Sequence, residues 1–307
     1  MENKQLPRVS ILLPIFNGVS TIKSAVQSII DQEYQDWELI ILDDGSTDES
    51  VRIIESIPDS RIKIISDGLH KGLATRLNEG IDLALGTYIA RMDADDLCFP
   101  NRLDKQVLFL DSHPEIDLTA CKTLAFNWDG ALESIRLLPY HQTHNELIAR
   151  PWRSIYMPHP SWLGKVAWFR QHRYGIPEVL RAEDQELLLR AMPESRYYCL
   201  PEILLAYRQG TFNLQKSLLA RKGLYLSQMR IFHSRQEWIF MAKSSWIMLQ
   251  KMIFDYLRAL SISISLLKNK SSGEVPSLVI DQLNAMINKY GSPYMLSSKN
   301  IKDKSLK

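Results

Sequence analysis

Residues 71–96 read KGLATRLNEGIDLALGTYIARMDADD, and this stretch decides the fold. Apolar side chains recur at helical spacing from Leu73 to Leu85, which predicts a helix with one buried face. Residues 87–92 then form a short apolar run that is typical of a buried strand. Three aspartates, at positions 93, 95 and 96, follow this run directly. The stretch therefore predicts a helix, a strand and an acidic loop in succession.

The chain before this stretch alternates between strand and helix patterns in the same way. Branched apolar runs at 9–16, 37–42 and 62–65 predict three further strands, separated by two segments with helical periodicity. This alternation favours parallel strands joined by right-handed crossovers, in a sheet that helices cover on both faces. In such sheets, ligands bind beyond the carboxyl ends of the strands. We therefore predict an α/β fold with a ligand site at that edge.

Acidic residues follow two of the predicted strands. Asp43 and Asp44 end the second strand, and Asp93, Asp95 and Asp96 end the fourth. We expect these five carboxylates to converge on one edge, where their repulsion must be offset by a cation. Hard oxygen ligands suit Mg²⁺ or Mn²⁺ bound together with substrate phosphates. The alternatives are a turn with a serine or threonine helix cap at 46 or 47, and a solvated loop at 93–96.

Several classes of protein are excluded by what the sequence lacks. It has neither the glycine pattern of a dinucleotide-binding fold nor that of a P-loop, which argues against a dehydrogenase and a P-loop nucleotidase. Cys98, Cys121 and Cys199 are odd in number and widely spaced, which argues against a disulfide framework and favours a reducing compartment. The first residues lack the layout of a signal peptide, and no uncharged apolar run reaches the roughly 18 residues of a spanning helix. We predict a cytoplasmic globular protein and expect no nucleic-acid partner.

Charge is distributed unevenly between the two ends of the chain. The 307 residues hold 37 Lys and Arg against 35 Asp and Glu, a formal charge of +2. Residues 216–307 hold 15 basic and 5 acidic residues, whereas residues 1–215 hold 22 basic and 30 acidic ones. An acidic first part and a basic second part indicate two regions with different partners. We place the domain boundary near residue 215.

The basic region has a helical pattern from residue 216 to residue 267. On a helical wheel, a polar arc includes Lys251, Asp255 and Arg258, and the apolar remainder includes Trp246 and Ile253. Such a helix can lie on an anionic membrane surface. It can also pack on the rest of the protein or on a second copy of itself. Residues 269–273 have the composition of a linker and residues 297–307 that of a frayed basic tail.

Six segments, in the same order along the chain, resemble the inverting glycosyltransferases of family 2, which have the GT-A fold. The resemblance covers roughly residues 8–208 and implies a mostly parallel sheet flanked by helices over residues 1–215, followed by a helical extension over residues 216–307. The six segments are VSILLPIFNG at 9–18, DDGSTDES at 43–50, the stretch at 71–96, HPS at 159–161, AED at 182–184 and LPEILLAYR at 200–208.

The resemblance assigns the donor side of a site to the ends of the first strands. Phe16 would lie against the base of a nucleotide, and the backbone of Pro14 would face the same base. Asp44 would accept a hydrogen bond from the base imide, and Lys71 stands where the family often has a basic residue near the donor. Asp93 would bind the ribose or the sugar of a nucleotide-sugar.

The metal and the acceptor side are assigned in the same way. Asp95 would ligate a Mn²⁺ or Mg²⁺ ion that bridges the diphosphate, and Asp184 matches the family's catalytic base. Glu183 would orient or contact the acceptor. Without the resemblance, the better interpretation of this acidic pair is a first helical turn, where acids stabilise the helix dipole. His159 borders the acceptor in the family pattern, and a core or capping role explains it as well.

These assignments imply a hexosyl- or N-acetylhexosaminyltransferase that uses a nucleotide-diphosphate sugar, with UDP the commonest nucleotide in the family. The acceptor would be a hydroxyl of a glycan or a lipid-linked glycan, in polysaccharide or lipo-oligosaccharide biosynthesis. Because relatives of this organisation often use lipid-linked acceptors, we favour a peripheral position on the inner face of the plasma membrane. The sugar, the linkage and the acceptor are not specified by the sequence.

Two other classes of protein fit parts of the pattern. A nucleotidyltransferase acting on sugar phosphates also uses acids and Mg²⁺ on an α/β sheet, but it usually has a Gly- and Lys-rich N-terminal loop, which residues 9–20 lack. A non-catalytic nucleotide-sugar-binding protein at the membrane would be expected to have lost one of four aspartates. Positions 44, 93, 95 and 184 all retain aspartate, which favours an enzyme.

Overall fold

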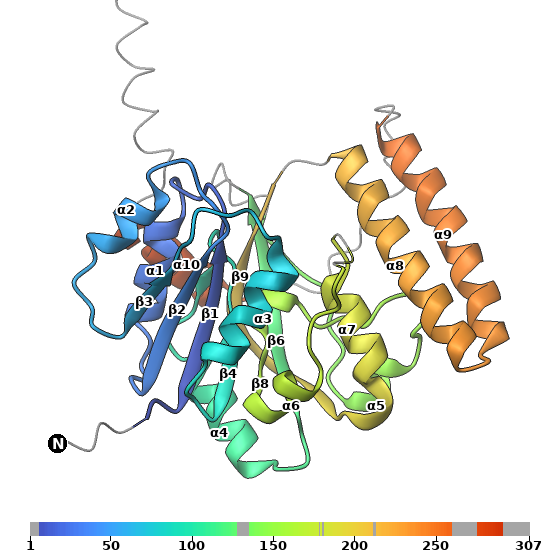
Figure 1. Cartoon of the computed structure of the whole chain (residues 1–307), viewed down its shortest axis with the longest axis horizontal. Helices are drawn as coiled ribbons and strands as arrows, with labels where there is room; N and C mark the ends of the chain where they lie inside the picture. Colours follow the sequence, from blue (N-terminus) through green and yellow to red (C-terminus); the bar gives the residue numbers. More distant parts are fainter. Residues whose placement is uncertain are drawn as a thin grey trace, which may run out of the picture.

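The computed structural model describes residues 6–127, 135–177, 179, 181–210, 213–259 and 275–290. Its strands form one sheet in the order β3–β2–β1–β4–β8–β6–β9–β5, with β7 paired to β6. Figure 1 shows this sheet with helices packed along both of its faces. The first four strands in this order are parallel, as the sequence predicts; they are β3 (Ile62–Ile65), β2 (Trp37–Asp43), β1 (Val9–Ile15) and β4 (Tyr88–Arg91).

The second half of the sheet mixes parallel and antiparallel pairs. Strand β6 (Leu118–Asn127) runs parallel to β9 (Tyr197–Gln209), and β8 (Leu163–Lys165) is antiparallel to both β4 and β6. Two short strands, β5 (Leu97–Cys98) and β7 (Arg136–Leu137), pair antiparallel with β9 and β6. Strand β8 therefore joins the predicted parallel half to the second half and brings the later segments of the chain beside β4.

Alternate side chains of β1 enter two separate apolar cores. Ile11 and Leu13 face one cluster, whereas Leu12 faces the other, as the two-residue period of a strand requires. The first cluster contains side chains of α1 (Ile22–Ile30), α2 (Ser50–Glu55) and α4 (Arg102–Ser112). The second contains side chains of α3 (Leu73–Leu83), α6 (Val166–Gln171) and α7 (Glu183–Ala191). Helix α5 (His144–Ile148) and two short 3₁₀ helices, at His159–Ser161 and Met192–Glu194, complete this part of the chain.

The described part of the basic region contains three helices, which pack in two different places. Helices α8 (Leu214–Ser234) and α9 (Trp238–Ala259) form a hairpin, and α8 packs against α7 (Figure 1). Helix α10 (Ser277–Tyr290) lies instead beside α1, where Leu283 and Met286 join an apolar cluster with Phe99 and Phe126. Within the described part of the chain, no helix is both long enough and apolar enough to cross a membrane.

The helical pattern predicted from residue 216 onward is divided into two helices, because the chain turns between Ser234 and Trp238. Lys251, expected among lipid headgroups, lies partly buried near Arg221 and Arg153, and burial followed by their charges lowers its pKa to about 8. The Arg258 side chain, residues 260–267, the linker at 269–273 and the tail at 297–307 lie outside the described residues. The three cysteines are buried and free, in agreement with the sequence prediction.

Candidate active site

The loops that follow β1 and β2 are tied together by hydrogen bonds. The Asn17 side chain accepts a bond from the Thr47 backbone N–H at 2.8 Å, and the Ser46 hydroxyl accepts one from the Asn17 N–H at 2.9 Å. The buried Asp43 carboxylate accepts bonds from the Ser46 N–H at 3.0 Å and from the Ser66 hydroxyl at 2.7 Å. The residues at 46 and 47 therefore join two loops and do not cap α2, so the helix-cap alternative is wrong.

Asp44, the predicted ligand of the base, is buried under the loop that precedes α3. Its Oδ1 accepts bonds from the backbone N–H groups of Lys71 at 2.7 Å and Gly72 at 3.1 Å, and the Arg76 Nε donates to the same oxygen at 3.2 Å. The Nδ1 of His70 lies 2.9 Å from the other oxygen. Gly72 has a positive φ of 89°, a conformation that glycine adopts without strain. Asp44 thus fixes this loop against the end of β2.

Phe16 and His70 form an aromatic pair beside Asp44. Their ring centroids are 4.7 Å apart at an interplanar angle of 41°, and Phe16 is 52% exposed. A planar nucleotide base could stack on an exposed aromatic ring of this kind. The neighbouring carboxylate could accept a hydrogen bond from an N–H group at the edge of the base. Pro14 lies within β1, in register with Leu42 of β2. The predicted base-binding residues therefore lie at the ends of adjacent strands, and the sequence analysis missed His70.

Lys71 belongs to a cluster of ion pairs on this loop. Its Nζ lies 2.6 Å from a carboxylate oxygen of Asp67 and 2.6 Å from one of Glu79. The fully buried guanidinium of Arg76 contacts the same two acids and Asp44. The ammonium group of Lys71 is therefore held by two acids, and Arg76, which the sequence analysis missed, connects Asp44 to helix α3.

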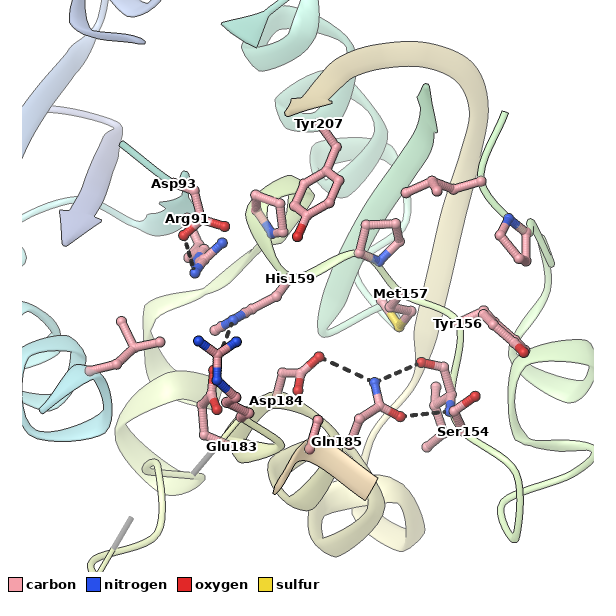
Figure 2. A pocket seen from close by; sticks show the side chains of 18 residues that line it. Arg91, Asp93, Ser154, Tyr156, Met157, His159, Glu183, Asp184, Gln185 and Tyr207 are labelled. Atoms are coloured by element: carbon pink, nitrogen blue, oxygen red, sulfur yellow. Dashed lines mark hydrogen bonds and ion pairs between the residues drawn. The ribbon is translucent and has the colours of Figure 1, made fainter. Parts of the chain in front are cut away.

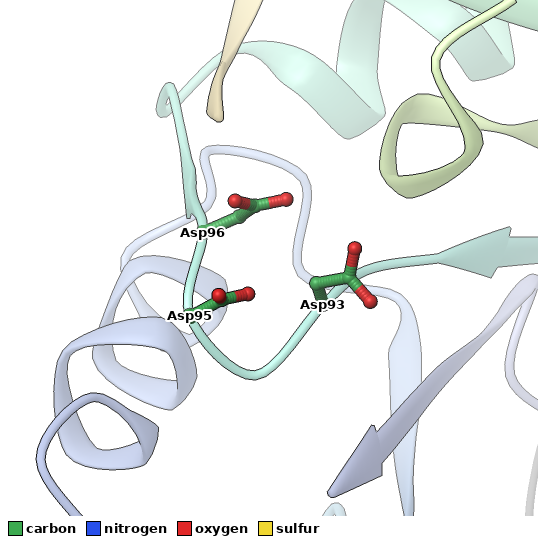
Figure 3. A group of neighbouring side chains, drawn as sticks. All are labelled: Asp93, Asp95 and Asp96. Atoms are coloured by element: carbon green, nitrogen blue, oxygen red, sulfur yellow. The ribbon is translucent and has the colours of Figure 1, made fainter. Parts of the chain in front are cut away.

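Asp93, Asp95 and Asp96 form a carboxylate cluster in the loop after β4 (Figure 3). One carboxylate oxygen from each lies within 4.8 Å of the others. Asp43 and Asp44 end a strand at the same edge of the sheet, as predicted, but they do not join this cluster, because hydrogen-bond donors in the same and neighbouring loops hold those two side chains. Three of the five predicted carboxylates therefore make up the cluster.

Burial and mutual repulsion shift the titration of this cluster. Burial, followed by the charge of Asp93, raises the pKa of Asp95 to about 6, and burial raises the pKa of Asp96 well above its ordinary value. One oxygen of Asp96 accepts the Arg208 backbone N–H at 2.8 Å, while the other is buried without a hydrogen-bond partner among the described residues. A cluster of three carboxylates, two of them with raised pKa values, offers the hard oxygen ligands that Mn²⁺ or Mg²⁺ prefers. Asp95 and its two neighbours are the residues that would hold such an ion.

Arg91 is a buried cation next to this cluster, and the sequence analysis gave it no role. It ends β4, and its Nη2 lies 2.5 Å from Oδ1 of Asp93. Its Nε and Nη1 are buried and have no hydrogen-bond partner among the described residues. The signal in the sequence is a single arginine in an apolar strand, two residues before the first of three aspartates.

A pocket of about 730 Å³ opens beside Asp93 (Figure 2). It brings together the end of β4, the 155–160 segment and the first turn of α7, which are far apart in the sequence. Asp93 belongs both to this pocket and to the carboxylate cluster, so it connects the predicted donor and acceptor sides. The polar side chains that line the pocket include Arg91, Asp93, His159, Glu183, Asp184, Gln185 and Tyr207.

Asp184 lies in the first turn of α7, which begins at Glu183. Its Oδ2 accepts a hydrogen bond from Nε2 of Gln185 at 3.2 Å, and Gln185 also bonds the Ile155 backbone N–H at 2.9 Å and carbonyl at 3.1 Å. Burial raises the pKa of Asp184 above its ordinary value, although the hydrogen bonds from Gln185 oppose this shift. A carboxylate with a raised pKa accepts a proton more readily than an exposed one.

His159 is a buried residue that also lines the pocket. Burial, followed by the charge of Arg91, lowers the pKa of its imidazole well below the ordinary value, so the ring is neutral. Burial raises the pKa of the Tyr174 phenol, which therefore keeps its proton, and its hydroxyl lies 2.6 Å from Nε2 of His159 in a hydrogen bond. The other ring nitrogen, Nδ1, is 3.9 Å from Oε1 of Glu183. His159 is both a core residue and a wall of the site.

The fold and the site together define a class of protein. Parallel strands in the order β3–β2–β1–β4, an aromatic pair at their carboxyl edge and a carboxylate cluster after β4 make up the GT-A arrangement of nucleotide-diphospho-sugar transferases. Residues 10–173 match Glycosyl transferase family 2, and the chain belongs to this family. The resemblance inferred from the six sequence segments is confirmed.

Comparisons with individual proteins agree with this assignment. The chain is 41% identical over 136 residues to EpsE of Bacillus subtilis, whose name places it among the glycosyltransferases; the match covers 43% of this chain and 49% of EpsE. It is 36% identical over 99 residues to WfgD of Escherichia coli, named a UDP-Glc:alpha-D-GlcNAc-diphosphoundecaprenol beta-1,3-glucosyltransferase, covering 32% of this chain and 39% of WfgD. The chain thus spans about half or less of the length of these curated relatives.

The fold itself is confirmed by a solved structure of low sequence identity. The mannosyltransferase PcManGT of Pyrobaculum calidifontis, solved with GDP-Man and Mn²⁺, superposes with a TM-score of 0.58 at 16% identity. The superposition covers 96% of this chain and 84% of that protein. A likeness over nearly the whole chain shows that the GT-A arrangement extends beyond the segment that the family match covers.

Proposed function

We propose that this chain transfers a sugar from a nucleotide-diphosphate donor to a hydroxyl of a glycan or lipid-linked acceptor, with inversion at the anomeric carbon. One observation carries the proposal: Asp93, at the end of β4, and Asp184, at the start of α7, line the same pocket. A donor bound at Asp93 and an acceptor bound at Asp184 would therefore meet. The names of WfgD and PcManGT, which mention UDP-Glc and GDP-Man, support a sugar nucleotide as the donor, and UDP is our first candidate.

On the donor side, the base would stack on Phe16 and His70 and meet the Asp44 carboxylate, with the Pro14 backbone close by. Asp93 would bind the ribose or the sugar, and its salt bridge to Arg91 holds it in place. The ammonium group of Lys71 is already bound to Asp67 and Glu79. Lys71 would therefore support the donor side through its backbone N–H, which holds Asp44.

On the acceptor side, Asp184 would take the proton of the acceptor hydroxyl as that oxygen forms a bond to the anomeric carbon. The bond from the anomeric carbon to the nucleoside diphosphate breaks in the same step, and inversion follows from attack on the opposite face. Glu183 would contact the acceptor, and neutral His159 would border it. A Mn²⁺ or Mg²⁺ ion held by Asp95 and its neighbours would offset the charge on the leaving diphosphate.

We place the reaction in polysaccharide or lipo-oligosaccharide biosynthesis at the inner face of the plasma membrane. The lipid diphosphate acceptor in the name of WfgD supports this choice. Residues 1–215 would form the catalytic unit and residues 216–307 a basic helical region. In the described part of that region, α8 and α9 form a hairpin outside the sheet and its cores. Helix α10 instead packs against the catalytic unit beside α1.

The test is a screen of sugar nucleotides for acceptor-dependent release of nucleoside diphosphate in Mn²⁺. UDP-, dTDP- and GDP-linked sugars would each be supplied with polyprenyl-diphosphate sugars, and Asp184→Asn would provide the background. We expect one donor to bind and to be turned over by the wild type only. Release of pyrophosphate from a nucleoside triphosphate and a sugar phosphate would identify a nucleotidyltransferase instead. Binding without turnover of any donor would favour the non-catalytic alternative.

A further inference from the structure

Helix α9 buries two of its polar side chains against the protein and leaves a row of apolar side chains exposed on the opposite side. Ser244 and Asp255 are buried, and Asp255 accepts a hydrogen bond from Nη2 of Arg221 on α8 at 2.8 Å. On the opposite side of the helix, Trp246 is 61% exposed and Ile253 is 52% exposed. A surface helix of a globular protein normally has the reverse orientation. The outward face of α9 is therefore apolar where a polar surface is the usual arrangement.

The exposed side chains form a continuous stripe along α9. They recur at intervals of three or four residues, and six of the eighteen large apolar side chains exposed in the described residues lie on this helix. Such a concentration on one helix marks an interaction surface, since single exposed apolar residues are scattered on most proteins. The stripe consists of Ile239, Ala242, Trp246, Leu249, Ile253 and Tyr256, with Trp238 at its beginning.

The charge of the hairpin indicates what covers this stripe. The described side chains of α8 and α9 include several lysines and arginines, and Lys216, Lys222 and Lys243 are exposed. The acid in these two helices, Asp255, is buried and paired with Arg221. A second copy of the chain would bring the same positive charge without exposed acids on these helices to pair with it. An anionic lipid surface would supply the opposite charge.

We propose that the outward face of α9 is a docking surface for a bilayer containing anionic lipid. Trp246 and Tyr256 suit the level of the headgroups, because each ring combines an apolar body with a polar group. Ile239, Leu249 and Ile253 would enter the acyl boundary, and the exposed lysines of the hairpin would lie among anionic headgroups.

Docking through α9 also bears on the acceptor, and this step rests on the proposed function. Ala220 of α8 lines the same pocket as Asp184, so α8 and α9 are the layers between the pocket and the proposed membrane surface. Each helix is about 10 Å thick with its side chains. The acceptor would then be a lipid-linked glycan whose reacting hydroxyl reaches about 20 Å from the headgroups, the thickness of two helices.

The experiment is co-sedimentation of the full chain with vesicles of phosphatidylcholine alone or with phosphatidylglycerol. The test variant is Trp246→Gln/Ile253→Gln, and the matched control is Leu83→Gln/Leu108→Gln, which changes two exposed apolar residues on α3 and α4. We expect the wild type and the control to bind the anionic vesicles. The test variant should bind at least tenfold more weakly while keeping the wild-type thermal unfolding midpoint, because both of its residues are at least half exposed.

Two results would overturn the proposal. The first is wild-type protein that stays in the supernatant with anionic vesicles at low salt. The second is a dimer, seen by sedimentation velocity, that Trp246→Gln/Ile253→Gln dissociates, since a second copy would then cover the stripe. The proposed function is tested separately, by measuring turnover of a water-soluble acceptor in the absence of vesicles. Turnover in a protein that does not bind vesicles would contradict the docking surface alone, and vesicle binding without turnover would contradict the function alone.

Discussion

Replacing Asp184 by asparagine should lower activity and raise stability at the same time. The proposed base loses its ability to accept a proton, so the transfer rate should fall by about 10²–10⁴-fold, the usual contribution of general base catalysis. The fold, however, disfavours the ionised form of Asp184, because burial raises its pKa. A carboxyl group with a raised folded-state pKa destabilises the fold at pH values above that pKa, and the penalty disappears when the group is protonated. The amide side chain of the variant carries no charge to desolvate.

The assays are turnover, donor affinity by calorimetry and thermal unfolding as a function of pH. At pH 7 the Asp184→Asn midpoint should lie above that of the wild type, and the difference should shrink as the pH is lowered through the raised pKa. Wild-type turnover should fall over the same pH range as the base becomes protonated.

Asp104→Asn is the matched control, since Asp104 occupies the first turn of α4 and is exposed. That change should leave turnover unaltered and cost about 0.3–1 kcal/mol through the helix dipole. Loss of donor affinity in Asp184→Asn would move this residue to the donor side and refute the reasoning.

Three further predictions concern the donor side. Asp95→Asn should remove most turnover and weaken Mn²⁺ binding measured by calorimetry, and full wild-type activity in excess EDTA would contradict a metal at this site. Asp44→Ala should raise the dissociation constant of the free nucleotide about tenfold, which corresponds to about 1.5 kcal/mol for one charge-assisted hydrogen bond; equal affinity of both proteins would remove Asp44 from the base site. Arg76→Met should lower the free energy of unfolding in urea by about 3 kcal/mol, because it leaves the buried Asp44 carboxylate without its ion-pair partner; Arg52→Met, at an exposed salt bridge, should change it by less than about 0.5 kcal/mol.

The first half of the sheet could be predicted because each of its strands is a short, mostly apolar run bounded by turn residues. The acidic loop after β4 was also predictable, since the three aspartates are adjacent in the sequence. The position of Asp44 was predictable, but its partners were not, because they lie 26 to 32 residues further along the chain and only the fold brings them close. His70 was missed for the same reason, whereas Arg91 was missed although its partner Asp93 is only two residues away, because the sequence does not show that its side chain is buried.

The orientation of α9 shows a limit of periodicity. A helical wheel identifies two faces of different polarity, but it does not show which face meets the protein. Here the two buried polar side chains of α9 find partners elsewhere in the protein: Arg221 of α8 neutralises Asp255, and the Trp152 carbonyl, in a turn, lies 3.5 Å from the Ser244 hydroxyl. Once these partners exist, the apolar face is free to turn outward. Predicting that arrangement requires knowing the partner helix, which the periodicity of α9 alone does not supply.

The hairpin and the proposed base are mechanically connected through helix α7. Glu186, two residues after Asp184, is buried and receives hydrogen bonds from Arg190 at 3.0 Å and from Arg230 of α8 at 2.9 Å. Leaving that carboxylate without its cations would expose a buried charge to a low dielectric, so the contact between α7 and α8 resists separation. Because Asp184 lies in the first turn of the same helix, the orientation of the hairpin also determines the position of the Asp184 carboxylate. A surface that holds α9 would therefore hold the acceptor side of the pocket in a fixed orientation.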